Sequence, residues 1–474
     1  MTLRTRLLSA ALVVTVAAGG AAAYAQHLPA AAASAPLTSI VVGSGTTALV
    51  GGLDLSAFMG GTDPDRRLIR LAYDRVQRAY YKPVADQMLI AGERKGLLSY
   101  LNAREVKNPQ VPANSATGDP ARDLRVLETT LSSTQQRYAK VAARDELTQA
   151  ALMGMLNGLG DPYTTYMTPR EIKSLDESLR GGNFGGVGVY IVQDPKTKDV
   201  LAQPIEGNPA IRAGVRTGDT IVAVDGKPVR GKKLDEVERA IRGPIGSVVA
   251  LTVKAKDAGE RTVRVTRAEI HVPSVAAKIE NGIAYVRLAD FGSSSAEEVR
   301  KAMLDAKHKG VHGYVLDLRN NGGGLLDAAV DVSSLFLPSG QAVVSTIDRA
   351  GSRETRTSGG GAIDAKPLVI LVNKYTASAS EITAGALQDY GVATLLGEKT
   401  FGKGVVQSLY TMPDKGALKI TTARYVTPKG RDIHHKGIVP DVVVQQRVDL
   451  PIIDTPRDVQ LAAAKKLIDH KDQP

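Results

Sequence analysis

Lys374-Tyr-Thr-Ala-Ser378-Ala-Ser380-Glu381-Ile, followed shortly by Thr400-Phe-Gly-Lys403-Gly-Val-Val-Gln407, is the part of the chain that decides its fold and chemistry. Ser378 stands in a run of small residues directly before a helical pattern, where an exposed nucleophile can be presented. Lys403 stands between two glycines in otherwise apolar sequence. Burial disfavours the ammonium form, so this lysine is a candidate general base near neutral pH. A neutral lysine can activate a serine hydroxyl without histidine.

The two motifs resemble those of the C-terminal processing peptidases, also called tail-specific proteases, and the resemblance extends from about residue 70 to about residue 445. It implies that Ser378 is the nucleophile, that Lys403 is the base and that Gln407 orients the lysine. Without the resemblance, Gln407 reads as an ordinary strand residue, because a straight strand would place it about 13 Å from Lys403. Ser380 is expected to cap the helix that follows it.

An acyl-transfer site also needs hydrogen-bond donors for an oxyanion. The backbone N–H of Ala379, at the start of the helix, is one candidate. A second donor is expected from the glycine loop at 322–324, because glycine lets a backbone N–H approach closely. The family uses a glycine of this loop, and the pattern does not separate Gly323 from Gly324. Residues between the preceding strand and the loop are interpreted as structural: Asp317, Arg319 and Asn320.

Residues 183–269 resemble a circularly permuted bacterial PDZ domain. The signals are Asn208-Pro-Ala-Ile-Arg-Ala-Gly-Val-Arg-Thr-Gly-Asp219 and the Val-Asp-Gly turn that ends at Gly226. PDZ domains add the end of a peptide as a strand and hold its carboxylate on backbone N–H groups of a glycine-containing loop. Gly186, Val187 and Gly188 are the candidates for that loop, although the glycines alone would suit a turn or bulge.

The fold class expected is a multidomain α+β protein, with a helical domain, a β-sandwich or barrel-like PDZ domain and an α/β core. In the family this core is crotonase- or ClpP-like. Two similar segments of the helical domain begin at Asp86 and Asp145, and each aspartate suits a helix cap. The expected boundaries are a signal peptide at 1–25, a flexible tether at 26–62, the helical domain at 63–182 with an insertion at about 103–143, the PDZ domain at 183–269, the peptidase core at 270–446 and a C-terminal helix or tail at 447–474.

Composition excludes several chemistries. The 474 residues include no cysteine, which excludes disulfides, thiolate metal sites and cysteine nucleophiles. Tryptophan is absent and aromatic residues make up 4%, so stacking platforms for nucleic acid are not expected. We interpret the net charge of +11 as a positive surface rather than a nucleic-acid footprint. No cofactor or metal is expected, since His308 and His312 lack the glutamate of a metalloprotease motif.

The N-terminus predicts export to the bacterial periplasm or cell envelope. Arg4 and Arg6 precede an uncharged stretch rich in Ala, Val and Leu, and Ala23-Tyr-Ala25 fits a cleavage site before Gln26. An uncleaved membrane anchor is the alternative, because the apolar stretch is nearly long enough to span a bilayer.

The sequence therefore predicts an exported serine endopeptidase that recognises C-terminal tails of protein substrates through its PDZ domain and cleaves with the dyad Ser378 and Lys403. The alternative is a non-catalytic PDZ scaffold on a degenerate core, against which the intact Ser378, Lys403 and Gln407 argue. The expected partners are proteins or peptides with free C-terminal tails. The helical domain could also support a homo-oligomer or bind an adaptor protein.

Overall fold

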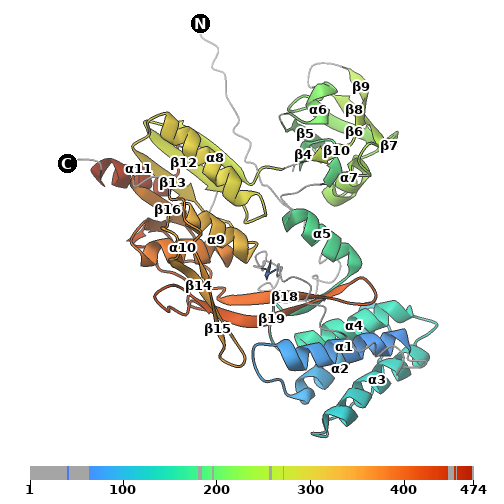
Figure 1. Cartoon of the computed structure of the whole chain (residues 1–474). Helices are drawn as coiled ribbons and strands as arrows, with labels where there is room; N and C mark the ends of the chain where they lie inside the picture. Colours follow the sequence, from blue (N-terminus) through green and yellow to red (C-terminus); the bar gives the residue numbers. More distant parts are fainter. Residues whose placement is uncertain are drawn as a thin grey trace.

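The computed structural model describes residues 40–41, 63–179, 184–194, 197–205, 207–255, 259–270, 272–363, 366–446, 453–454 and 456–471. They form a helical unit, a small β unit and a large mixed core, so the predicted multidomain α+β class is confirmed (Figure 1). The predicted signal peptide and all of the tether except Ile40–Val41 lie outside the described residues. In the ranges given above, no helix has the length and apolar character needed to cross a membrane.

The helical unit is built from four helices: α1 (Pro64–Ala79), α2 (Asp86–Ala103), α3 (Pro120–Arg137) and α4 (Arg144–Asn157). The two similar sequence segments are α2 and α4, and α3 comes from the stretch interpreted as an insertion. The predicted caps are wrong: the N-cap residues of α2 and α4 are Ala85 and Ala143. Asp86 instead accepts hydrogen bonds from Tyr73 Oη and Gln77 Nε2, at 2.8 and 2.5 Å, and so ties α2 to α1.

Glycines let α2 and α4 pack backbone against backbone. A Cβ at Gly92 would lie 2.4 Å from the carbonyl oxygen of Gly154, and a Cβ at Gly154 would lie 2.6 Å from the Cα of Gly96. Both distances are shorter than a side chain tolerates, so the pair of helices depends on these glycines. Leucines of α1 to α4 fill the surrounding core.

The β unit has a five-stranded antiparallel sheet in the order β4-β5-β6-β8-β9, with β7 on β6. Its entry and exit strands, β3 and β10, pair with each other. Helix α7 packs against β4, an edge strand of the sheet. The elements are β3 (Phe184–Gly186), β4 (Val189–Gln193), β5 (Val200–Pro204), α6 (Pro209–Arg212), β6 (Thr220–Val224), β7 (Lys227–Pro228), α7 (Leu234–Ile241), β8 (Val248–Lys254), β9 (Glu260–Thr266) and β10 (Ala268–Ile270).

The core contains a sheet in the order β11-β12-β13-β16-β17-β20, in which all neighbours except β11 and β12 are parallel. Side chains alternate between its two faces: Leu316 and Ile370 join the cluster under α8, α9 and α10, whereas Val315 and Val369 pack on α11. The elements are β11 (Val275–Glu280), β12 (Ile283–Leu288), α8 (Ser295–His308), β13 (Gly313–Asp317), α9 (Leu326–Ser334), β16 (Leu368–Val372), α10 (Ala379–Asp389), β17 (Thr394–Gly397), β20 (Val442–Val443) and α11 (Val459–Lys471).

A second sheet, which the sequence analysis did not predict, joins the core to the helical unit. Its order is β1-β18-β19-β14-β15, and β2, which follows α4, pairs with β19 (Figure 1). Leu418 and Ile420 of β19 are part of the hydrophobic core of the helical unit. Its elements are β1 (Ile40–Val41), β2 (Thr165–Met167), β14 (Ala342–Asp348), β15 (Arg353–Thr357), β18 (Val405–Thr411) and β19 (Ala417–Val426); α5 (Pro169–Leu179) follows β2 and leads toward the β unit.

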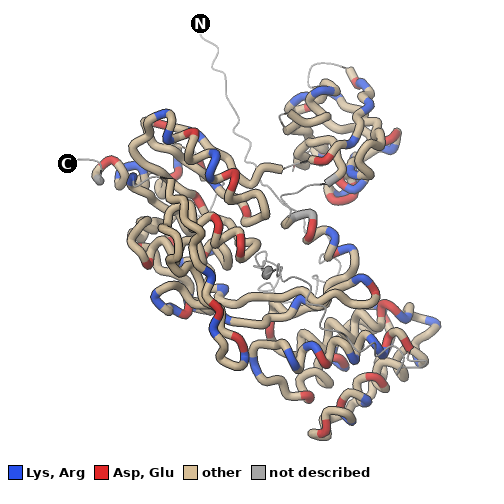
Figure 2. Tube along the Cα trace, in the orientation of Figure 1, with Lys and Arg blue, Asp and Glu red and all other residues tan. Residues whose placement is uncertain are grey.

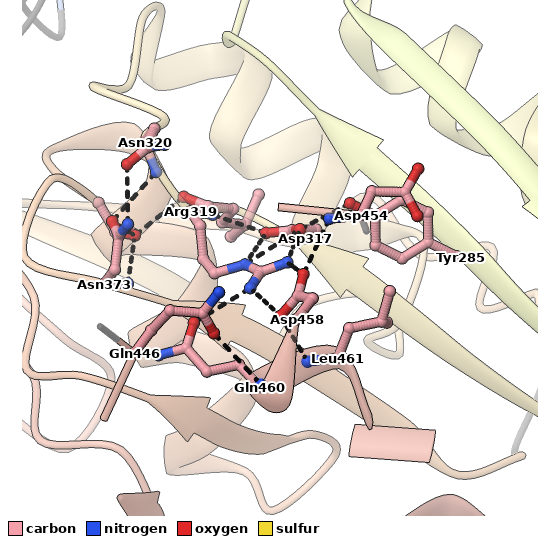
Figure 3. Close-up of polar contacts among 12 residues, drawn as sticks. Tyr285, Asp317, Arg319, Asn320, Asn373, Gln446, Asp454, Asp458, Gln460 and Leu461 are labelled. Carbon is pink, nitrogen blue, oxygen red and sulfur yellow. Dashed lines mark hydrogen bonds and ion pairs between the residues drawn. The ribbon is translucent and has the colours of Figure 1, made fainter. Parts of the chain in front are cut away.

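A buried ionic cluster fastens α11 to the core (Figure 3). The guanidinium of Arg319, 2% exposed, contacts both carboxylate oxygens of Asp317 and both of Asp458, at 2.6–3.1 Å. Tyr285 Oη donates to Asp317 at 2.7 Å and Gln460 Oε1 accepts from Arg319 at 3.1 Å. The neighbouring guanidinium lowers the pKa of Asp458, against the effect of burial. Asp317 and Arg319, which the sequence analysis interprets as structural, therefore have a specific role: they attach the C-terminal helix α11 to the core.

Replacing Arg319 with leucine should lower the free energy of unfolding of the core by about 3–5 kcal/mol, because two buried carboxylates lose their counter-charge. Urea denaturation followed by circular dichroism measures the change. Arg122→Ala is the matched control, since its ion pair with Asp119 is exposed and is worth at most about 1 kcal/mol. A loss below about 1 kcal/mol in Arg319→Leu would contradict the assigned role.

Candidate active site

Ser378 lies between the end of β16 and the first residue of α10. Its backbone adopts φ 62° and ψ −118°, a conformation that costs a non-glycine residue about 1–3 kcal/mol and is concentrated at functional sites. The side chain is fully buried. Ala379, the residue predicted to supply an oxyanion donor, is the first residue of α10, so its N–H lies at the positive end of the helix.

Lys403 lies just before β18 in a loop that only glycines permit. A Cβ at Gly402, whose φ is +89°, would lie 2.7 Å from the N atom of Gly437, and a Cβ at Gly404 would lie 2.7 Å from that of His434. The N–H of Gly404 donates to His434 Nδ1 at 3.3 Å. The segment that carries His434 thus packs directly on the lysine loop and holds it in place.

The amine of Lys403 is buried without a counter-charge in contact. Its exposure is 0%, and Nζ has no hydrogen-bond partner within the part of the chain that the structure describes. The Tyr163 ring, from the end of the helical unit, has its centroid 4.8 Å from Nζ. Burial, followed by the like charge of Lys419, lowers the pKa of Lys403 well below its usual value, while Asp161 and Glu381 act weakly in the opposite direction. This arrangement favours the neutral amine.

The carboxylate of Glu381 connects the serine segment with the lysine segment. Its Oε2 accepts from the N–H groups of Ser378 and Lys403, both at 2.9 Å. Its Oε1 accepts from Thr400 Oγ1 at 2.5 Å and from the N–H of Gly402 at 2.7 Å. Tyr425 makes a second connection, because its Oη lies 3.1 Å from the Ser378 carbonyl oxygen and 2.7 Å from that of Lys403. These contacts bring the predicted nucleophile and base into one site.

The glycine loop lies against the serine. A Cβ at Gly323, whose φ is +100°, would lie 2.9 Å from Ser378 Cβ and 2.8 Å from the N atom of Ala379. The N–H of Gly323 donates to Asn321 Oδ1 at 2.8 Å. Ser380 Oγ donates to the Asn321 carbonyl at 3.0 Å, and Ser378 is the N-cap residue, so the prediction that Ser380 caps the helix is wrong.

Gln407 is buried in β18, where a β-bulge between Val406 and Gln407 shifts the pairing with β19. A bulge bends the strand and re-aims the side chain, so the estimate for a straight strand does not apply here. Gln407 Nε2 donates to Thr421 Oγ1 at 3.2 Å, and Oε1 has no partner among the described residues.

Several residues at this site were not identified from the sequence. Glu381 gives no sequence signal beyond its place in the first turn of a helix, and Tyr425 and Thr421 give none because they lie in the unpredicted strand β19. Asp161 lies in the Asp-Pro motif that ends the helical domain, and its carboxylate reaches Thr421. The spacing of Asp161 from the dyad in sequence gave no indication of this contact.

The predicted carboxylate loop lies in the β unit, at a distance from the dyad (Figure 1). Gly186 belongs to β3, Val187 is buried and Gly188 has φ +72°. Carbonyl groups of Val187 and Gly188 accept from the N–H groups of Ala210 and Ile205, at 2.8 and 2.9 Å, which fixes the loop next to edge strand β4. The structure therefore separates this group of predicted residues from Ser378 and Lys403.

Comparisons with known proteins identify the family. Models of peptidase family S41, of a PDZ domain and of the activating protease CtpB N-terminal domain match residues 282–444, 200–254 and 100–170. The last range includes α3, the helix interpreted as part of an insertion.

Named relatives share much of the chain. The carboxyl-terminal-processing protease of Synechocystis sp. is 40% identical over 70% of this chain and 80% of its own length. That of Picosynechococcus sp. is 42% identical over 70% and 82%. The solved structure of a photosystem II D1 C-terminal processing protease is 31% identical, with a TM-score of 0.47 over 84% of this chain and 98% of the other. The chain belongs to the carboxyl-terminal-processing proteases of peptidase family S41, which are serine-type peptidases.

Proposed function

We propose that this protein is an exported endopeptidase that captures protein substrates by their C-terminal tails in its PDZ domain and hydrolyses them with a dyad of Ser378 and Lys403. The observation that carries the proposal is the Glu381 carboxylate, which binds the backbone of both residues beside a buried lysine amine. Export rests on the N-terminal sequence alone.

In the proposed reaction, the neutral Lys403 amine takes the proton of the Ser378 hydroxyl as Oγ attacks the scissile carbonyl carbon. The resulting ammonium returns its proton to the leaving amine, and the peptide C–N bond breaks. Water then attacks the acyl-enzyme while Lys403 accepts one of its protons. The acyl C–Oγ bond breaks, the Lys403 ammonium returns the proton to Ser378 Oγ, and the new carboxyl terminus is released. The low pKa of Lys403 supports this role, since the base must be unprotonated before each attack.

The oxyanion of each tetrahedral intermediate would be held by the Ala379 N–H and by the glycine loop. Support for the first donor is its place at the start of α10. For the second, Gly324 is favoured, because the N–H of Gly323 is already donated to Asn321. The close approach of Gly323 to Ser378 and Ala379 brings the loop to the right side of the nucleophile.

The substrate would lie extended along β18. Ile40–Val41 of this chain pairs in parallel with Gln407 and Ser408, next to α9. This edge of the sheet, which carries Gln407, therefore accepts an extended backbone. In the PDZ domain, the edge of β4 beside α7, which no described strand pairs with, offers a similar place for a tail.

Cleavage of an unfolded protein with an apolar C-terminal tail tests the dyad. Ser378→Ala and Lys403→Ala should each lower the rate by at least about a thousandfold, because nucleophile or base is lost. Gel electrophoresis and mass spectrometry follow the products. Ser352→Ala and Lys429→Ala, both exposed positions, serve as matched controls and should cleave normally. Cleavage that persists in Ser378→Ala would refute the proposed nucleophile.

Lys419→Met tests the electrostatic tuning of the base. Lys419 is a partly buried lysine whose like charge lowers the pKa of Lys403. Removing it should raise that pKa, so the rising limb of kcat/KM against pH should move to higher pH. A limb that stays in place or moves to lower pH would contradict the assignment of Lys403 as the titrating base.

Gly188→Ala tests tail capture. An added Cβ would lie 2.2 Å from Asn208 Cβ and would displace the loop. We expect KM for a tailed substrate to rise about tenfold, which corresponds to about 1.4 kcal/mol of binding, while a tailless substrate is cleaved as before. Gly246→Ala is the control, because this glycine also has positive φ but has open space around it. Equal effects on both substrates would argue against a role of the loop in tail binding.

A further inference from the structure

We propose that Asp161, at the end of the helical unit, is a positioning residue for peptide hydrolysis: it acts through Thr421 to fix which way the Gln407 amide faces. The inference rests on the proposed dyad, and it assigns to the helical domain a direct part in arranging the catalytic base.

Three polar groups form a chain from the helical unit to β18. Thr421 Oγ1 donates to Asp161 Oδ2 at 2.6 Å, and Gln407 Nε2 donates to Thr421 Oγ1 at 3.2 Å. Thr421 and Gln407 are fully buried, so bulk water does not compete for these bonds. Asp161 and Thr421 are separated by 260 residues in the sequence, and the contact exists only when the two units are docked.

The chemistry of the groups fixes the direction of every bond. An ionised carboxylate can only accept, so the Thr421 hydroxyl proton must point to Asp161. The hydroxyl oxygen is then left to accept, and the amide of Gln407 must present its NH₂ end to it. The carbonyl end, Oε1, consequently faces away from Thr421. Because Asp161 at one end of this chain of hydrogen bonds can only accept, the orientation of the Gln407 amide at the other end is determined.

The orientation of the Gln407 amide matters because two buried polar atoms at the site have no hydrogen-bond partner among the described residues. Gln407 Oε1, an acceptor, and Lys403 Nζ, a donor, are both buried and both lack a hydrogen-bond partner among the residues described. A neutral amine has two N–H donors and one lone pair. If Gln407 Oε1 accepts one N–H, the lone pair is restricted in direction and can be aimed at the Ser378 hydroxyl. A flipped amide would present NH₂ to the lysine and could not accept this N–H.

The helical unit holds Thr421 by its backbone as well. The N–H of Thr421 donates to Thr164 Oγ1 at 3.0 Å, and its carbonyl accepts from the N–H of Tyr81 at 3.0 Å. Thr164 Oγ1 also donates to Asp161 Oδ2 at 2.7 Å, and the N–H of Tyr163 donates to Oδ1 at 2.9 Å. The carboxylate is therefore itself fixed, as a positioning group must be.

Three substitutions in the full-length protein test the inference. Asp161→Asn and Thr421→Val should each lower kcat about tenfold or more, with KM changed less than about twofold, because the substrate contacts are untouched. Thr421→Ser keeps the hydroxyl and should retain kcat near that of the parent. Asp161→Asn in a Gln407→Ala background should have little further effect, since both act through the same amide.

The pH profile separates the effect of the relay, which is the hydrogen-bond chain Asp161–Thr421–Gln407, from the simple loss of the Asp161 charge. Asp161 raises the pKa of Lys403, so Asp161→Asn should move the rising limb of kcat to lower pH. Thr421→Val keeps the carboxylate, so its limb should stay in place although kcat falls. A fall in kcat of Thr421→Val at an unmoved limb would therefore be an effect on the base that loss of the Asp161 charge does not explain.

Tyr166→Phe is the matched control for docking. Tyr166 Oη bonds to Asp414 across the same boundary but has no part in the relay, so kcat should be unchanged. Parental kcat in Asp161→Asn and Thr421→Val, a change in KM alone, or failure of Thr421→Ser to retain activity would overturn the inference. Loss of cleavage in Ser378→Ala, measured alongside, shows that the proposed function stands in those cases, whereas cleavage by Ser378→Ala would refute that function itself.

Discussion

The Glu381 carboxylate is buried and accepts hydrogen bonds from four donors, and the arrangement of the site depends on this. A carboxylate removed from water without partners costs several kcal/mol, so the backbone around it is constrained to supply them. Burial raises the pKa of Glu381, while the bonds from Thr400, Ser378, Lys403 and Gly402 lower it. The Glu381 side chain thus holds the Ser378 turn and the Lys403 loop together, although Glu381 is neither the proposed nucleophile nor the proposed base.

The Lys403 amine differs from the Glu381 carboxylate in its hydrogen bonding. Glu381 has a donor for each oxygen, whereas Lys403 Nζ and Gln407 Oε1 have no partner in the described residues. Native interiors rarely leave buried polar atoms unpaired, and exceptions call for an explanation. The proposed role of Lys403 accounts for this exception, because an amine held in a salt bridge would stay protonated and could not act as a base.

Features that depend on neighbouring residues were predictable from the sequence, whereas contacts between remote segments were not. The helix that follows Ser378 was predictable, because its apolar spacing is encoded within the element itself. The residues of the proposed dyad were predicted from two short motifs. The second sheet, the bulge before Gln407 and the contacts of Asp161 depend on pairing between remote segments, which no local pattern records. Two of the three cap errors have a similar origin, since Asp86 and Ser380 bond to Tyr73 and to the Asn321 carbonyl instead.

Pairing between remote segments also determines at which stage of folding the site can form. Ser378, Lys403 and Gln407 lie in one core, but Tyr163 and Asp161 reach it from the helical unit, through a strand, β2, that pairs with β19. Long-range contacts form late, because the entropy of closing a long loop must be overcome before the contacts contribute. A core that has folded without the helical unit would lack the ring beside the lysine and the carboxylate behind Thr421. In a peptidase that is to act only after folding, placing part of the site on a distant unit makes the active arrangement depend on completion of the whole molecule.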